Sequence, residues 1–181
     1  MSAHILTPDS SPKAISSAFA TGAPSVFLAG SIENGAADDW QVKAIKALSA
    51  AFDDIVIVNP RRVNWNPNLV QSIHEPEFKH QVTFELDHIE KVDTVLVWID
   101  PSTKSPITLL ELGLLSGSVY MGDINRTVVG CPQGFYRRGN VEVVCDRYRI
   151  PLVETFGDLI QRTSEILQRN YQRRVEFRSK A

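Results

Sequence analysis

Four short, mostly apolar runs recur along this chain, and each gives way to a turn residue or a polar loop. They are Val26–Gly30, Ile55–Val58, Thr94–Ile99 and Arg126–Val129. Strands with one wet face alternate apolar and polar residues, whereas unbroken apolar runs are typical of parallel strands covered on both faces. The runs therefore predict buried strands of a parallel sheet. They are far shorter than the roughly 20 residues that span a bilayer.

Segments with helical spacing separate these strands. The predicted helices cover 39–52, 77–91, 105–115 and 155–168, and 150–153 is a short fifth strand. Ser105 and Pro106 suit the cap and the first position of the third helix. Because strands and helices alternate, we predict an α/β fold: a flavodoxin-like, doubly wound sheet of about five parallel strands with helices on both faces. Ligands of such folds bind beyond the carboxyl ends of the strands.

The composition fits one ordinary globular domain. The chain has 181 residues, 43% hydrophobic and 22% charged, and its net charge of −2 gives no reason to expect a nucleic-acid partner. We expect a flexible, Ser- and Pro-rich arm over 1–24, the domain over 25–168 and a basic tail over 169–181. The arm lacks the long apolar stretch of a secretory signal, so we expect a cytoplasmic protein that binds no membrane.

Two glutamates fall on apolar faces of predicted helices, where a charge is costly unless it is paired or protonated. At about 100° per residue, Glu85 lies inside the apolar stripe that runs from Phe78 to Ile89. Glu111 is the only ionisable residue in the helix over 105–115. A helix-edge position or an arginine partner would explain either acid alone. Because both helices border one strand, we favour a site with two nearby carboxylates of separated pKa values, as used to cleave glycosidic bonds.

Several motifs, in order and spacing from about residue 25 to 160, resemble those of the nucleoside 2-deoxyribosyltransferases. The motifs are Phe27-Leu28-Ala29-Gly30-Ser31-Ile32, Asn59-Pro60-Arg61-Arg62, Gln81-Val82-Thr83-Phe84-Glu85-Leu86, Pro106-Ile107-Thr108-Leu109-Leu110-Glu111-Leu112-Gly113, and Val128-Val129-Gly130-Cys131 with Asn140-Val141. The resemblance is closest to the branch with a PxTLLELG helix. It implies a flavodoxin-like enzyme of nucleotide salvage that moves 2-deoxyribose from one nucleobase to another, with no metal and no cofactor.

The resemblance also implies roles for the two acids. Glu111 is expected to attack the anomeric carbon and form a covalent deoxyribosyl-enzyme, after which the incoming base attacks the same carbon with net retention. Such attack needs an ionised, poorly solvated carboxylate beside an oxocarbenium-like centre. Glu85 stands where relatives commonly carry aspartate, and it is expected to exchange a proton with the departing and arriving bases.

Further residues are expected to bind the substrate. By resemblance, Gly30 and Ser31 border the sugar, Ser105 meets its 5′-hydroxyl or 5′-phosphate, and Asn140 enters the site of a neighbouring subunit. The last expectation implies a homo-oligomer whose partners are nucleosides and free nucleobases. The full expected set is Phe27, Gly30, Ser31, Asn59, Trp65, Ser105, Thr108 and Asn140.

Three members of this set are open to other interpretations. Relatives often have tyrosine where Phe27 stands, so either another donor, such as Tyr136, holds Glu111, or Glu111 is less firmly oriented. Asn59 and Trp65 suit contact with a base, but turn chemistry explains the same loop equally well. Arg61 and Arg62, in the same loop, could bind a phosphate, but such arginines more often pair with surface acids.

Two other functions remain open. The chain could hydrolyse deoxynucleosides or their 5′-monophosphates, and the ratio of base exchange to hydrolysis distinguishes that activity. It could also be a nucleotide-binding module without turnover, but such a protein would gain stability by losing Glu85 and Glu111. His80 and His88 lack the further ligands of a metal site, so we expect none.

Overall fold

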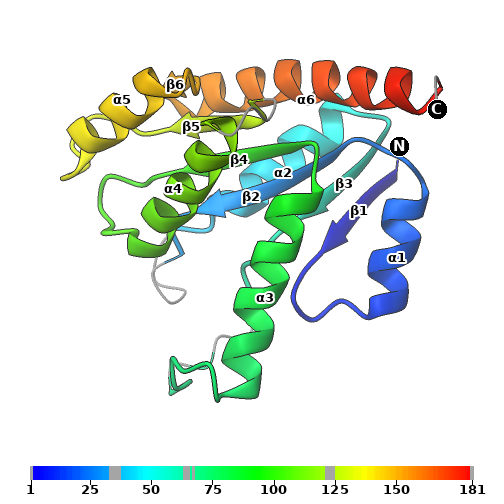
Figure 1. Cartoon of the computed structure of the whole chain (residues 1–181), viewed down its shortest axis with the longest axis horizontal. Coiled ribbons are helices and arrows are strands. Elements are labelled where there is room, and N and C mark those ends of the chain that lie inside the picture. The colour runs from blue at the N-terminus through cyan, green and yellow to red at the C-terminus, as the bar shows by residue number, and fades with distance from the viewer. Residues whose placement is uncertain (1, 33–37, 63–65, 67, 121–124, 180–181) are drawn as a thin grey trace.

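In a computed structural model, the described residues (2–32, 38–62, 66, 68–120 and 125–179) form a six-stranded, all-parallel sheet with helices on both faces (Figure 1). Its strands are β1 (Ser2–Leu6), β2 (Ser25–Gly30), β3 (Asp54–Val58), β4 (Thr94–Trp98), β5 (Thr127–Gly130) and β6 (Leu152–Val153). Its helices are α1 (Pro12–Ala20), α2 (Trp40–Ala51), α3 (Pro76–Lys91), α4 (Pro106–Tyr120), α5 (Arg138–Arg147) and α6 (Phe156–Arg178). None of these helices is both long enough and apolar enough to cross a bilayer.

The strand order confirms the predicted fold. The sheet runs β1-β3-β2-β4-β5-β6. Without β1, the remaining strands follow the flavodoxin-like order, in which the second strand lies outside the first and the later strands continue on the other side. The order of the strands reverses between β2 and β4, so their carboxyl ends mark the place where ligands of this fold bind.

The N-terminal segment is not the flexible arm that we expected over 1–24. β1 pairs in parallel with β3, from Ser2 opposite Asp54 to Leu6 opposite Val58. α1 follows, and the Ser11 hydroxyl caps it by accepting a hydrogen bond from the Ala14 N–H. A Ser- and Pro-rich composition resembles a loop, but Ser11 followed by Pro12 is also the signal of a helix start. We call residues 2–20, from the start of β1 to the end of α1, the N-terminal unit.

The prediction of a separate basic tail over 169–181 is also wrong, because α6 continues through Arg178. The Arg174 side chain pairs with Asp93 at 3.2 Å and donates to the carbonyls of Gly22 and Ala23, both at 2.8 Å. The Asn170 amide donates to the Asp93 carbonyl at 3.1 Å. The second half of α6 is therefore fixed to the loops at the amino ends of β2 and β4.

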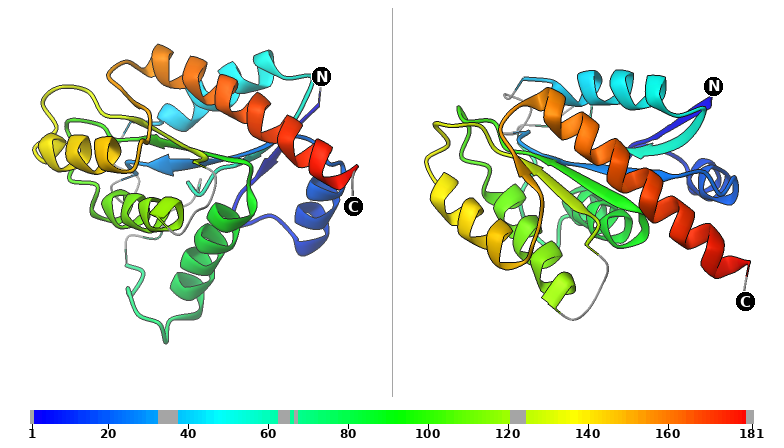
Figure 2. Two further views of the ribbon diagram at one scale, coloured as in Figure 1. Left: turned by 45° about the horizontal axis from the view of Figure 1, so that its top comes forward. Right: turned by 90° about the horizontal axis from the view of Figure 1, so that it is seen from above.

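Two buried apolar clusters lie on opposite faces of the sheet. One face is covered by α1, α3, α4 and α5, and the other by α2 and α6 (Figure 2). Alternate residues of β2 enter the two clusters: Phe27 and Ala29 enter the first, Val26 and Leu28 the second. The two acidic helix positions, Glu85 on α3 and Glu111 on α4, therefore belong to helices that cover the same face.

Candidate active site

Glu111 lies on the buried side of α4, one turn after Thr108 and one turn before Leu115. Its side chain is only 8% exposed. Burial and, to a smaller extent, the negative charge of Glu85 together raise the pKa of Glu111 to about 8. Within the described part of the chain, no group donates a hydrogen bond to this carboxyl. A desolvated acid without a donor favours its protonated form.

Glu85 is half-buried on α3 and has different surroundings. The Gln81 side-chain amide donates to its carboxylate at 2.7 Å. Burial raises the pKa of Glu85, while this hydrogen bond and the positive charge of Arg62 oppose the rise. Because Glu85 has a donor and a nearby cation, it ionises before Glu111 does.

The buried face of α3 differs from the predicted stripe. Its buried residues include Gln81, Phe84, His88 and Ile89, whereas Leu86 is exposed. The buried face of α3 is therefore rotated around the helix from the predicted stripe and includes two polar residues. Glu85 is half-buried between Gln81 and Ile89 on this face.

Ser31 and Ser105 meet in a cluster of three buried hydroxyl groups. The Ser31 hydroxyl lies 2.5 Å from that of Ser105 and 2.9 Å from that of Thr103. It also accepts a hydrogen bond from the Asp100 N–H at 2.9 Å. The cluster joins the end of β2 to the loop that leads into α4, and Ser105 has a φ of 47° there. Contact of these hydroxyls with a sugar stays a prediction.

Of three other expected substrate residues, Phe27 and Thr108 are buried and Gly30 is half-buried at the end of β2. The Phe27 side chain is fully buried in the core below α3 and α4, and Thr108 is buried on α4. Gly30 has a φ of 152°, and a Cβ there would collide with the Trp98 carbonyl and the Trp40 ring. These residues shape the end of β2 through packing, and Phe27 has no surface that a ligand could contact.

The loop after β3 favours turn chemistry for Asn59. The Asn59 side chain accepts a hydrogen bond from the Arg61 backbone N–H at 3.1 Å, and the Asn59 backbone N–H donates to the Leu6 carbonyl. The Arg61 side chain lies 3.8 Å from Asp39. This arginine therefore has an acidic neighbour, as expected if it pairs with a surface acid. Trp65 lies outside the described residues.

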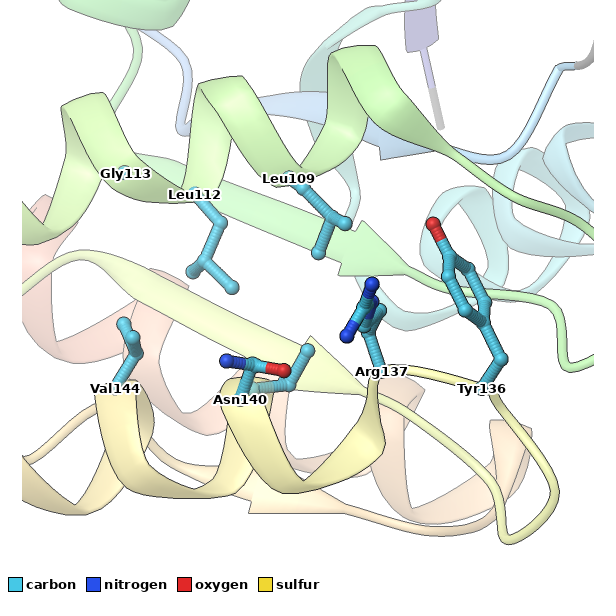
Figure 3. Close-up of a pocket in the computed structure, with 8 residues that line it drawn as sticks. Leu109, Leu112, Gly113, Tyr136, Arg137, Asn140 and Val144 are labelled. Atoms are coloured by element: carbon cyan, nitrogen blue, oxygen red, sulfur yellow. The ribbon is translucent and has the colours of Figure 1, made fainter.

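Asn140 lines a groove of about 360 Å³ between α4 and α5. Figure 3 shows its amide on α5 facing Leu109 and Leu112 across the groove, with Arg137 beside it. The hydroxyl of Tyr136, at one end of the groove, lies 3.5 Å from the Lys104 carbonyl and makes no described contact with Glu111. The proposed replacement of the family tyrosine by Tyr136 therefore has no support here.

The two α3 histidines have structural partners. The His80 ring nitrogen Nε2 lies 2.9 Å from the Pro8 carbonyl, and His88 Nδ1 lies 2.7 Å from the Phe84 carbonyl. Among the described residues, His, Cys, Asp and Glu side chains do not gather in groups of three that could hold a metal ion. His80 instead connects α3 to the N-terminal unit.

Sequence reasoning missed Gln81 and Thr103 as members of the site, and for Arg62 it offered a phosphate or a surface acid rather than Glu85 as the neighbour. Gln81 had a detectable signal, because it precedes Glu85 by four residues and so lies one helical turn away. Arg62 and Thr103 had no local signal, because their neighbours Glu85 and Ser31 are distant in sequence.

Comparison with known proteins identifies the family of the chain. No curated protein matches the chain. The family profile described as nucleoside 2-deoxyribosyltransferase like matches residues 23–135, which include both acids and the hydroxyl cluster but neither the N-terminal unit nor Asn140. Because the match covers more than half of the chain and includes both carboxylates, the chain belongs to the nucleoside 2-deoxyribosyltransferase-like family.

Proposed function

We propose that this protein transfers 2-deoxyribose between nucleobases, with Glu111 as the nucleophile and Glu85 as the proton carrier. The observation that carries the proposal is the electrostatic coupling of a buried and a half-buried carboxyl group on helices that cover one face of the sheet. Two such groups do not ionise together at neutral pH, so the pair keeps one proton. One carboxylate and one carboxylic acid are what a retaining glycosyl transfer needs.

The proton balance follows from this count. Glu111, as carboxylate, forms a bond to the anomeric carbon while the bond from that carbon to the base nitrogen breaks. The proton of the pair, carried by Glu85, goes to the departing base. In the second half, the incoming base attacks the same carbon, returns its proton to Glu85 and releases Glu111. Two displacements at one carbon give net retention.

The free protein holds the shared proton mainly on Glu111, because Glu85 ionises first. The reaction requires that proton on Glu85. A base nitrogen that accepts a hydrogen bond from Glu85 favours the protonated form of this acid, and so favours the ionised form of Glu111. Substrate binding therefore sets the reactive state of the pair.

The direct test mixes a deoxynucleoside with a different free base and follows the products by chromatography. We expect a new deoxynucleoside, and a protein mass increased by one deoxyribosyl group when the free base is removed. Failure of every pair of bases to exchange would refute the transferase. Release of base without exchange, even with acceptor in excess, would establish the hydrolase in its place.

We also propose that the active form is a homo-oligomer in which Asn140 serves a neighbouring site. Ile107, Leu110 and Leu114 form an exposed apolar face on α4, and Asn140 is exposed in the adjacent groove. Apolar side chains exposed in this way on one helix are typical of an interface. The neighbour that fits is a second copy of the chain.

Subunit mixing tests this arrangement. Neither E111A nor N140A alone is expected to be active, whereas a mixed dimer of the two has one site with Glu111 from one copy and Asn140 from the other. We expect activity to return on mixing under conditions that exchange subunits. If light scattering gives a monomer, or if mixing restores nothing while subunits do exchange, Asn140 does not act across an interface.

A further inference from the structure

Gln81 is buried between α3 and the loop after β3, with 6% of its side chain exposed. Its amide nitrogen Nε2 makes two hydrogen bonds, one to the Glu85 carboxylate at 2.7 Å and one to the Pro60 carbonyl at 2.9 Å. Both partners are acceptors, so only the nitrogen of the amide can face them. The orientation of this side chain is therefore fixed by chemistry, and both of its N–H groups are used.

The two hydrogen bonds connect parts of the molecule that are separate in sequence. Glu85 lies one turn along α3 from Gln81, whereas Pro60 directly follows the Asn59 turn at the carboxyl end of β3. Gln81 therefore connects the acid to the sheet. The Gln81 carbonyl oxygen is buried and has no partner among the described residues, which means that the side chain is held by its donors alone.

A second group supports the same carboxylate from the loop. The charge of Arg62 favours the ionised form of Glu85. Arg62 is itself held by Glu77 of α3 at 2.6 Å, and it lies 3.8 Å from Asp9, which belongs to the segment between β1 and α1. The charged groups identified around Glu85 are thus Arg62 from the loop and Glu111 from α4.

We propose that Gln81 is a positioning residue, which orients the Glu85 carboxylate with one N–H and anchors it to the end of β3 with the other. This inference rests on the proposed function, in which Glu85 carries the proton. A carboxylate on a flexible side chain loses rotamer freedom when it must meet a base nitrogen, and a fixed donor removes part of that cost before the substrate binds. Gln81 need not touch the substrate to act in this way.

The test replaces Gln81 by Met, which has a similar length but no N–H donor, and by Asn, which keeps the donor on a shorter stem. We expect Q81M to lower kcat/KM by about tenfold and to move the acidic limb of the pH–rate profile to higher pH. Q81N keeps the donor, so its acidic limb should shift less than that of Q81M. In an E85Q background, Q81M should have almost no further effect, because it acts through Glu85.

A matched control lies on α6. The Gln161 amide donates to Glu165 at 3.2 Å with the same four-residue spacing, but that pair is exposed. Q161M should leave kcat/KM and the pH profile unchanged. Equal losses from Q81M with and without Glu85 would instead show that Gln81 only supports the fold, and that result would overturn the inference.

A carbon-13 NMR titration of the glutamate carboxyl groups separates this inference from the proposed function. The E85Q variant assigns the Glu85 signal, and we expect Q81M to raise the pKa of Glu85 whether or not the protein turns over. An unchanged Glu85 titration in folded Q81M, with exchange intact in the wild type, would refute the role of Gln81. A raised pKa in a protein without exchange would refute only the transferase.

Discussion

Helices α3 and α4 each place one carboxyl group near the same site, but they surround it differently. α4 is apolar around most of its circumference, and Glu111 is buried there without a described donor. α3 buries polar residues as well, and its Glu85 has the Gln81 amide and the Arg62 charge nearby. Because the donors lie on one side only, two acids of the same type acquire different proton affinities. In the free protein this difference keeps the shared proton mainly on Glu111, so the proposed reaction requires the bound substrate to favour its transfer to Glu85.

Removing Glu111 should have the largest effect. We expect E111A to lower base exchange by at least about 10⁴-fold, because the covalent intermediate cannot form. Steady-state exchange and the mass of the trapped protein measure this loss. An E111A protein that still exchanges bases at a near-normal rate would reverse the roles assigned to the two helices.

Removing the charge of Glu85 should have a smaller effect that depends on the leaving base. General acid–base catalysis typically contributes about 10²–10⁴-fold, so we expect E85Q to lose on the order of 10²–10³-fold with natural bases. The loss should shrink for a base analogue that departs without protonation, because no proton is then needed. A uniform loss for all leaving groups would contradict a proton-carrying role.

The apolar surroundings of Glu111 should also make the free energy of unfolding depend on pH. The folded protein keeps the Glu111 proton up to a pKa of about 8, whereas the unfolded chain loses it near 4.5. The folded state thus binds more protons between these values, and this contribution to the free energy of unfolding is complete below about pH 4.5 and is lost as the pH rises through 8.

We therefore expect E111Q to gain stability relative to the wild type between pH 5 and pH 8, on the order of 3 kcal/mol. Urea unfolding at the two pH values measures this gain. Glu85 and His88 titrate in both proteins, so their contributions largely cancel in the comparison. A constant difference between wild type and E111Q across the pH range would contradict an elevated pKa of Glu111.

The smallest effect is expected where the N-terminal unit meets α3. Asp9 is exposed and lies 3.8 Å from Arg62, so D9N should change the free energy of unfolding by less than about 0.5 kcal/mol. R62Q removes the charge that acts on Glu85, so it should raise the pKa of that acid and shift the acidic limb of the activity profile. A larger shift from D9N than from R62Q would show that the N-terminal unit controls Glu85 by another route.

Local pattern explains how much of the fold could be predicted. Unbroken apolar runs identified β2, β3, β4 and β5, since a parallel strand covered on both faces leaves that pattern in any sequence. β1 lacks the pattern because it lies at the sheet edge, where Ile5 is exposed. The whole N-terminal unit was consequently mistaken for a flexible arm.

The same distinction applies to the site. Helical spacing identified Glu85 and Glu111 as acids out of place, because a charge on an apolar face is visible within one helix. It could not show that Ser31 and Ser105 face each other, since 74 residues separate them. Nor could it show that Phe27 is sealed in the core, which depends on how α3 and α4 pack over β2.

The sequence by itself determined strands β2 to β5, the flavodoxin-like class and the two acids, since each depends on residues a few positions apart. The tertiary structure decided how Glu85 is supported, because Gln81 reaches the Pro60 carbonyl and the Arg62 charge acts on Glu85 only when the loop after β3 packs against α3. It also decided that β1 pairs with β3 and that Arg174 of α6 binds Asp93. Contacts between distant segments leave no periodic trace in a sequence, so only the folded chain specifies them.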